Sequence, residues 1–193
     1  MATIATKIPT DVWEHIAKNA GVLLSDFTVE TKEGSTAWTV DTSKIIGATT
    51  GGIKFEDVPE FIDYGEDIDN CPKNMMELKR IDTREVKMSG TFVAVSPETI
   101  KKLAGAADLA TNKITPRDDL KNSDFEDLWF VVDYGEGGAI AVHMLNALST
   151  AGLVIQSDDK EKGEFEFEFT GHYSMSAQDT VPYEVYIKEG STT

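Results

Sequence analysis

The sequence predicts a mainly β fold of the α+β class, built from antiparallel strands. Most of the 193 residues lie in segments rich in β-branched and aromatic residues, separated by Gly, Asp, Asn and Pro. The connections between neighbouring strands are too short for the crossovers that parallel strands need, so antiparallel pairing should dominate. No internal repeat or low-complexity linker divides the chain, and a single domain over residues 1–193 is expected.

The strand pattern recurs along the whole chain. Polar tips at 135–138 and 157–162 predict hairpins, and the glycines of "GATTGG" at 47–52 predict a bulge or a tight hairpin. The expected strands are residues 21–30, 44–56, 84–95, 128–134, 139–148, 152–157, 163–175 and 181–187.

Two helices and one helical turn are expected among these strands. The first is "DVWEHIAKNAG", with Thr10 or Asp11 as its cap and Gly21 as its stop. The second is "SPETIKKLAGAADL", capped by Ser96 with a proline in its first turn. A single turn is expected at Ser123.

The charge of the chain excludes several partners. With 34 acidic and 18 basic residues, the formal net charge is -16, which argues against gripping nucleic acid or anionic membranes through phosphate contacts. Cys71 is the only cysteine, so no intrachain disulfide can form. The first residues lack the pattern of a secretory signal, and no run approaches the roughly 20 apolar residues of a membrane helix. A soluble protein made in a cytoplasm is expected.

Two strands alternate strictly between apolar and polar side chains. In "GEFEFEF", Phe165, Phe167 and Phe169 point to one face of a strand, and Glu164, Glu166 and Glu168 point to the other. In "REVKMSGTFVAV", the apolar face carries Val86, Met88 and Phe92, and the polar face carries Glu85. These six apolar residues are the predicted core, and the carboxylates form a hydrophilic front that faces water.

No catalytic residue, metal site or cofactor is predicted. Glu164 and Glu166 would stand about 6.5 to 7 Å apart, near the spacing of an inverting glycosidase pair, but equivalent glutamates lack the unlike environments that such a pair needs. The three histidines are scattered, and the acidic stretch at 63–69 lacks the Gly and Glu of a calcium loop. A solvated acidic loop is favoured over a calcium site.

One segment does not fit a compact β domain. Residues 63–82, "DYGEDIDNCPKNMMELKRID", run from acidic to basic between two strand signals. Loops of this length are usually functional or disordered, so a contact outside the subunit is expected to hold it.

The succession of these segments resembles the major tail tube proteins of long-tailed bacteriophages, of the siphophage type. The resemblance covers about 180 residues, and none of its pieces is a catalytic fingerprint. It is carried by "NAGVLLSDF", "IIGATTGGIKFEDVPEFIDYGEDIDNCPKN", "REVKMSGTFVAVSPETIKKLAGAAD", "KITPRDDL", "GGAIAVHMLNALSTAGL" and "KGEFEFEFTGHYSMSAQDTVPYEVYI".

The resemblance implies two packed antiparallel sheets, as a sandwich or half-barrel flanked by a helix, and assembly as stacked hexameric rings. Four strands from each of six subunits would line a lumen with a barrel of about 24 strands. The acidic row (Glu164, Glu166, Glu168 and Glu85) would face that lumen, or else the outer surface. The loop at about 63–82 would reach neighbouring subunits through Asp63, Glu66, Asp67, Asp69, Lys73 and Asn74. No immunoglobulin-like domain is expected after the last strand.

The implied partners are other copies of the chain, the tape measure, tail terminator and distal tail or baseplate proteins. DNA would pass through without specific binding, and neither a cofactor nor a membrane is involved. The implied location is the virion tail, assembled in the bacterial host cytoplasm. The alternative is a monomeric β-sandwich module for binding or adhesion, whose acidic face is merely solvated.

Overall fold

The computed structural model describes residues 12–29, 38–157 and 159–190. In these ranges seven strands form one sheet and two more form a small separate sheet. The strands are β1 (Ala17–Leu24), β2 (Gly47–Asp63), β3 (Lys79–Val95), β4 (Ala107–Ala110), β5 (Lys113–Pro116), β6 (Glu126–Tyr134), β7 (Gly138–Ser149), β8 (Phe165–Gly171) and β9 (Tyr183–Lys188). The helix is α1 (Pro97–Leu103), and the 3-10 turns are η1 (Val12–His15), η2 (Thr42–Lys44), η3 (Met76–Leu78) and η4 (Asn122–Asp124).

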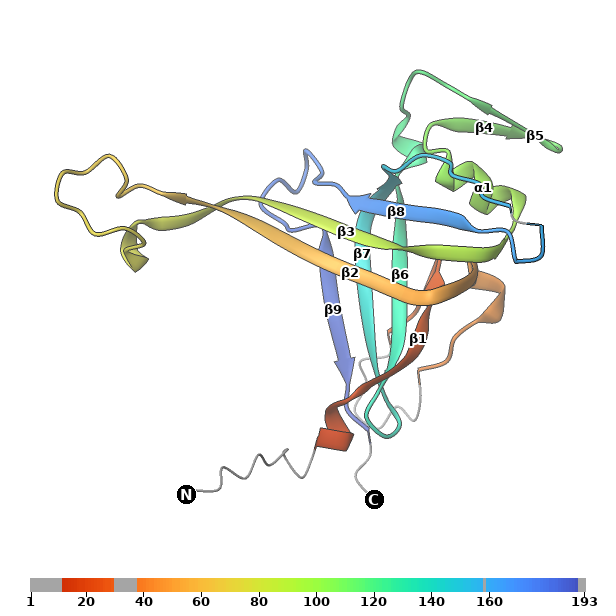
Figure 1. The fold of residues 1–193 in the computed structure, drawn as a ribbon, viewed down its shortest axis with the longest axis horizontal. Helices are drawn as coiled ribbons and strands as arrows, with labels where there is room; N and C mark the ends of the chain where they lie inside the picture. The colour runs from red at the N-terminus through yellow and green to blue at the C-terminus, as the bar shows by residue number, and fades with distance from the viewer. Residues whose placement is uncertain (1–11, 30–37, 158, 191–193) are drawn as a thin grey trace.

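The large sheet curls into two layers. β7 pairs with β6 on one side, and on its other side it pairs first with β9 and then, at Ala147–Ser149, with β8. β8, β3 and β2 therefore leave the first layer at the end of β7 and run across it (Figure 1). Every strand pair is antiparallel in the described ranges. The predicted mainly β class with packed antiparallel layers is confirmed.

The main core lies between the two layers. One layer contributes Leu23, Leu128 and Met144, and the other contributes buried side chains of β3 and β8. The rings of Phe92 and Phe167 stack with centroids 4.3 Å apart. Of the six predicted core residues, five are at most 2% exposed, and Phe165 is partly buried against them; the five are Val86, Met88, Phe92, Phe167 and Phe169.

Gly90 is required where β3 meets β8. It is paired with Phe167, whose ring lies over the glycine backbone. A Cβ at this position would stand 2.8 Å from Cζ of Phe167. The missing side chain lets the ring lie flat in the core, which is a common reason for glycine inside a strand.

A second apolar cluster covers the opposite face of the β1–β6–β7–β9 layer. It is centred on Phe27, Trp129 and Val131, and alternation along β6 places Trp129 and Val131 away from Leu128. Phe27 contacts both Trp38 and Trp129, with ring centroids 5.8 and 5.7 Å apart. This layer is thus buried on both faces over part of its length.

The first predicted helix is wrong. Its expected cap residues lie outside the described residues, and the sequence from Val12 forms one 3-10 turn followed by β1. Asn19 and Gly21 both have positive φ, at a register shift where β1 pairs with β6. A Cβ on Gly21 would stand 2.4 Å from the ring of Phe130. Pairing with β6 and burial of Leu23 override the weak local helix signal.

The predicted strand at 152–157 is not formed, since Gln156 makes only an isolated bridge with Glu164, but other local predictions agree better with the structure. Ser96 caps α1 by accepting a hydrogen bond from the Thr99 backbone, as expected, but the helix ends at Leu103 and Ala107 begins β4. The turn at Ser123 is η4. The bulge predicted in "GATTGG" is present in β2, at the register shift between Thr50 and Ile53.

The interior position of Phe167 generates a stability prediction. Phe167→Ala should lower the free energy of unfolding of the subunit by about 3 to 5 kcal/mol, because it removes a buried ring and leaves a cavity. Glu166→Ala, at the neighbouring exposed position, should change it by no more than about 0.5 kcal/mol. Denaturant unfolding measures both. Equal midpoints for the two variants would contradict the placement of the phenylalanine row in the core.

Candidate interaction surfaces

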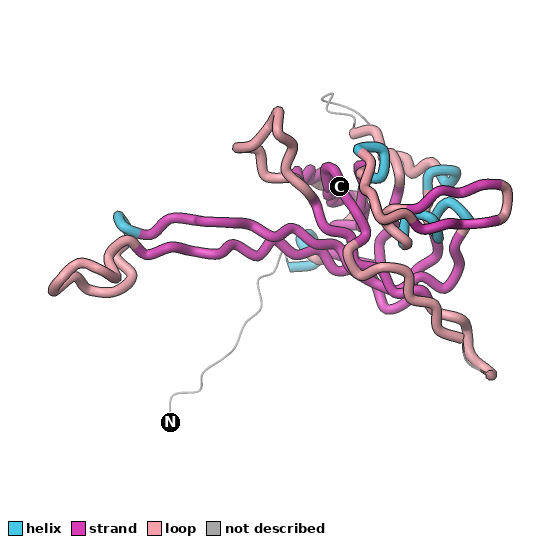
Figure 2. The backbone as a smooth tube through the Cα atoms, turned by 90° about the horizontal axis from the view of Figure 1, so that it is seen from above, coloured by secondary structure: helices cyan, strands magenta, loops and turns pink. Residues whose placement is uncertain are grey.

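The longest feature of the molecule is the β2–β3 hairpin. Each strand has 17 residues, and the two pair from Gly47 and Val95 at one end to Asp63 and Lys79 at the other. β8 pairs only with residues 87–92 of β3, so among the described residues the rest of the hairpin has no neighbouring strand at that edge. We call residues 58–85 the arm. Figure 2 shows it projecting well beyond the body.

The predicted loop at 63–82 therefore needs correction. Lys79–Asp82 belong to β3, and the connection between the strands is residues 64–78. The alternation of β3 at 85–92 does not continue into residues 79–82, because the register with β2 shifts between Thr83 and Ile81. The connection is therefore the tip of a paired β-hairpin.

The arm exposes apolar side chains that its own chain does not cover. These side chains are between 36% and 80% exposed, with Met76 the most exposed. Alternation puts Phe61 on the face of β2 that carries Phe55 in the body, where Phe55 packs against the core. The large apolar residues exposed on the arm are Val58, Phe61, Ile62, Tyr64, Ile68, Met75, Met76 and Ile81. Phe61 thus continues the core face of the sheet into solvent, whereas Val58 and Ile62 lie on the opposite face.

The tip of the arm is organised around Asp63. Its carboxylate accepts hydrogen bonds from the backbone N–H of Gly65 (2.9 Å) and of Asn74 (2.8 Å). Both bonds lower the pKa of Asp63, and the bond from Gly65 has the larger effect. Lys79 donates to the Asn74 side chain at 3.1 Å, and its Nζ lies 5.0 Å from the centroid of the Phe61 ring. Glu66, Asp67, Asp69 and Lys73 are exposed on the same loop.

The base of the arm is held by a polar cluster. Arg84 pairs with the Asp57 carboxylate, and Tyr183 at the start of β9 donates a hydrogen bond to it at 2.9 Å. This bond to a carboxylate raises the pKa of Tyr183. The Tyr183 ring also meets Phe55 edge-on, with centroids 5.1 Å apart. The cluster fixes the direction in which the arm leaves the body.

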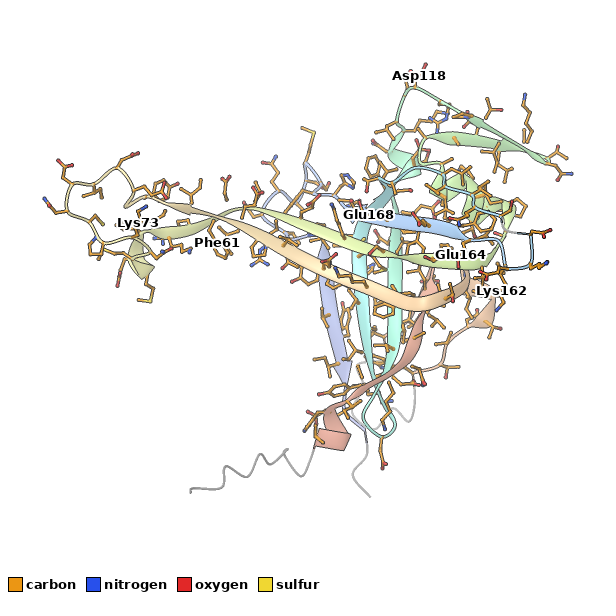
Figure 3. All side chains as sticks on the ribbon, in the orientation of Figure 1. Phe61, Lys73, Asp118, Lys162, Glu164 and Glu168 are labelled. Atoms are coloured by element: carbon orange, nitrogen blue, oxygen red, sulfur yellow. The ribbon has the colours of Figure 1, made fainter. Side chains whose placement is uncertain are left out.

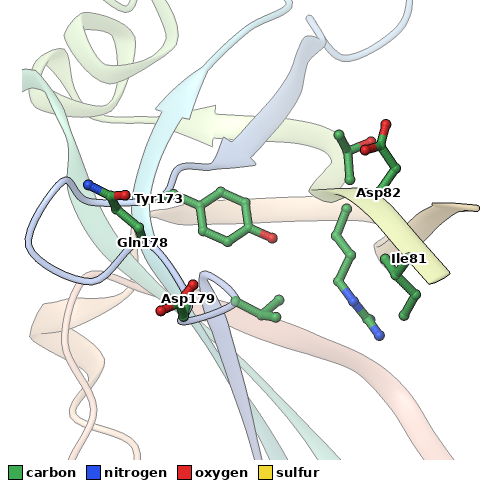
Figure 4. Close-up of a pocket in the computed structure, with 8 residues that line it drawn as sticks. Ile81, Asp82, Tyr173, Gln178 and Asp179 are labelled. Carbon is green, nitrogen blue, oxygen red and sulfur yellow. The ribbon is translucent and has the colours of Figure 1, made fainter. Parts of the chain in front are cut away.

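A groove opens where the arm meets the body. Its volume is about 480 Å³, and Figure 4 shows Ile81 and Asp82 of β3 across from Tyr173, Gln178 and Asp179. Ile81 and Tyr173 are 46% and 45% exposed. The groove therefore extends the exposed apolar surface of the arm onto the loop that precedes β9.

The acidic row lies on the outer face of the β2–β3–β8 layer. Glu164 and Glu166 are exposed, and Figure 3 shows Glu164 and Glu168 along β8, far from Lys73 on the arm. Glu168 is half-buried and lies opposite Ser89. Glu85 is exposed on the same face of β3. The structure brings these four carboxylates onto one face, away from the core.

Lysines on this face are paired, which the sequence pattern did not reveal. Lys87 lies 2.9 Å from the Glu85 carboxylate and 3.7 Å from that of Glu168. The hydrogen bond with Glu85 is the main reason that the pKa of Lys87 is raised. Lys54 on β2 pairs with Glu56 at 2.6 Å. The face thus exposes carboxylates to solvent, while Lys54 and Lys87 are paired with glutamates of the same face.

Two kinds of site are absent from the described part of the chain. No group of three or more His, Cys, Asp or Glu side chains there is arranged to hold a metal ion. None of the helices in those ranges has the length and apolarity to cross a membrane.

The similarity of this chain to known proteins is found in three-dimensional structure and not in sequence. No protein-family model matches the chain, and no curated protein sequence is significantly similar to it. Among solved structures, it is similar to a chain described as "Virion of native gene transfer agent (GTA) particle", with a TM-score of 0.44 and 10% sequence identity. The similarity covers 82% of this chain and 96% of that one.

The contacts of Asp63 predict a pH-dependent arm tip. Because its pKa is lowered in the folded protein, the stabilisation by its carboxylate is present above the ordinary value of about 3.9 and is lost as pH falls through the lower folded value. Asp63→Asn should speed hydrogen exchange at the Gly65 and Asn74 amides at pH 7. Asp67→Asn, on the exposed loop, serves as control. Unchanged protection of both amides in the Asp63 variant would contradict this role.

Proposed function

We propose that this protein is a virion structural protein, the subunit of a bacteriophage tail tube that assembles from stacked rings and conducts DNA during ejection. The observation that carries the proposal is the arm, a paired hairpin whose apolar side chains find no cover in the subunit. The succession of segments that resembles the tail tube proteins supports the same conclusion.

The energetics of the arm favour a neighbouring subunit as its partner. A two-stranded ribbon without a third strand is only marginally stable in water, and each exposed apolar side chain gains free energy when it is covered. Contiguous apolar patches on soluble proteins usually mark interaction sites. The arm lacks a third strand in the described ranges and exposes large apolar side chains, and hydrogen bonds to Asp63 hold the backbone of its tip. Contact with another copy in the tube would bury this surface.

The acidic face supports a conduit for DNA. A wall of lysine or arginine would displace counterions from the phosphates and gain affinity at each step, and that affinity would act as friction. Glutamates gain nothing from phosphate. In the proposed tube Glu85, Glu164, Glu166 and Glu168 line the lumen, and the pairing of Lys87 with Glu85 removes a cation that DNA would otherwise meet.

The proposal includes the location and the partners that such a tube requires. The subunits would be made and assembled in the host cytoplasm and would reside in the virion tail. Tape measure, tail terminator and distal tail or baseplate proteins would meet the tube along its lumen or at its ends. No catalytic role and no cofactor is part of the proposal.

Electron microscopy of the purified protein tests the proposal directly. At high protein concentration and in a series of salt concentrations, rings or long tubes are expected. A strict monomer under all these conditions would overturn the proposal and would favour the monomeric binding module.

Removal of the arm tip tests the contact that carries the proposal. Deletion of residues 66–76 should leave the body folded, because the core lies outside this range, and should abolish regular stacking. Circular dichroism checks the fold and electron microscopy checks the assembly. If normal stacked tubes still form, the arm does not hold the neighbouring subunit.

Charge reversal tests the lumen assignment. Particles with Glu164→Lys, Glu166→Lys and Glu168→Lys should assemble yet eject DNA slowly or incompletely, because the wall then attracts phosphate. The matched control reverses three exposed acids elsewhere, Glu98, Asp118 and Asp119. Ejection kinetics from purified particles provide the measurement. Equal, normal kinetics for both triple variants would place the acidic row outside the lumen.

A further inference from the structure

A second open pocket lies beside the loop that connects β8 and β9. Its volume is about 460 Å³, and it is formed where the η4 turn, the end of β7 and the segment after β8 meet. We call it the loop pocket. None of the described residues that line it is Asp, Glu, Lys or Arg, although 27% of the chain is charged. The lining consists of Asn122, Phe125, Asn146, His172 and residues 173–175.

The loop pocket is built on an irregularity in β7. Asn146 has a positive φ of 48° at the register shift where β7 pairs with β6. Its backbone N–H donates to the Asp127 carboxylate at 2.9 Å, and its side-chain amide donates to the His172 carbonyl at 3.0 Å. A non-glycine residue in this conformation persists only where its surroundings hold it, and such strain is concentrated at functional sites. The bonds of Asn146 thus fix the end of β7 against the segment after β8.

The orientation of the His172 ring leaves one of its nitrogens as an acceptor. Nδ1 lies 3.2 Å from the Asn146 carbonyl oxygen, which can only accept a hydrogen bond, so Nδ1 carries the hydrogen. In the neutral ring Nε2 then keeps its lone pair. The ring also meets Phe125 edge-on, with centroids 5.2 Å apart. His172 therefore supplies a held hydrogen-bond acceptor beside an aromatic ring.

Two further polar groups of the loop pocket have no partner among the described residues. They are the side-chain amide of Asn122, which is exposed, and the hydroxyl of Tyr173, a residue that is 45% exposed. The amide and the hydroxyl can each both donate and accept. Together with His172 they place donors and acceptors next to the rings of Phe125 and Tyr173. This set fits a ligand whose own polar groups donate as well as accept.

The loop that carries Tyr173 is ordered by its own hydrogen bonds. Ser174 and Ala177 form an isolated bridge, and the Gln178 side chain donates to the Met175 carbonyl at 3.1 Å. Tyr173 also lines the groove at the base of the arm, where Figure 4 shows it beside Gln178. The loop pocket is thus formed before a ligand arrives, as is usual for small-molecule sites of this volume.

We propose that the loop pocket binds the ring of a neutral sugar. A carboxylate or phosphate only accepts hydrogen bonds and would meet no Lys or Arg there, and an ammonium group only donates and would meet no Asp or Glu among the described lining residues. Sugar hydroxyls do both, and the C–H faces of a sugar ring pack against aromatic rings. A nucleobase has a similar mixture of groups, but the net charge of -16 disfavours the phosphates that accompany it.

Sugar binding would be a property of the single subunit. It goes beyond the proposed tube and does not depend on it, since every lining residue comes from one copy. A result against sugar binding would therefore leave the tube proposal intact, and a protein that never forms tubes could still bind the sugar.

Saturation transfer difference NMR on the purified protein tests the site, because it detects weak ligands on subunits and assemblies alike. The probes are the methyl glycosides of glucose, galactose, mannose and N-acetylglucosamine. At least one should bind with a dissociation constant of about 1 mM, as expected for a ligand of this size. Glucuronate and adenosine serve as the anionic probe and the nucleobase probe. No signal from any of the four glycosides, or signals from glucuronate or adenosine alone, would overturn the proposal.

Two substitutions locate the binding. Tyr173→Ala removes an exposed ring and should weaken binding of the glycoside by at least about tenfold. Asn122→Asp keeps the shape of the side chain but removes its N–H donors, and it should weaken binding by about tenfold, the order of one lost hydrogen bond. The matched control is Tyr64→Ala on the arm, where the tyrosine is 62% exposed, and it should bind as the parent does. All three variants should keep the thermal midpoint of the parent, because the positions are exposed. Parent-like binding by both pocket variants would contradict the assignment of the sugar to this pocket.

Discussion

The fold depends on β7 serving two layers at once. Its first half pairs with β9 and its last residues pair with β8, while β6 runs along its other side. Because backbone hydrogen bonds fix both partners, the sheet must turn at this point, and the turn encloses the core around Phe167. The same turn leaves β2 at the outer edge of the second layer, paired with β3. Their free length can then leave the body as the arm.

Much of the fold could be predicted from local patterns. The alternation of Phe and Glu in β8 fixes which side chains enter the core. A strand has two faces, and the charged glutamates stay in water while the phenylalanines are buried. The glycines of β2 and the Ser96 cap likewise act through their immediate neighbours. Such features need no knowledge of distant residues.

The failures share a physical cause. The region from Val12 to Leu24 has both helix and strand signals, and pairing with β6, more than 100 residues away, decides between them. The loop predicted at 63–82 includes the start of β3, because two exposed faces give a strand no clear apolar side. Residues 152–157 have a strand pattern, yet only Gln156 forms a bridge, because the register along β8 is not encoded in any local pattern. The pairing of Lys87 with glutamates on two strands is a product of the same register.

The cluster at the base of the arm has a mechanical consequence. Residues 58–63 of β2 extend about 20 Å beyond Asp57, so a load applied at the tip acts on the body through a lever. Arg84, Asp57 and Tyr183 stand at the pivot, and Tyr183 connects that pivot to β9 and through it to β7. Bending of the arm would therefore be resisted by the sheet rather than by a flexible joint. In a stack of rings, this geometry would pass a tilt of one subunit to the next and would give the column its stiffness.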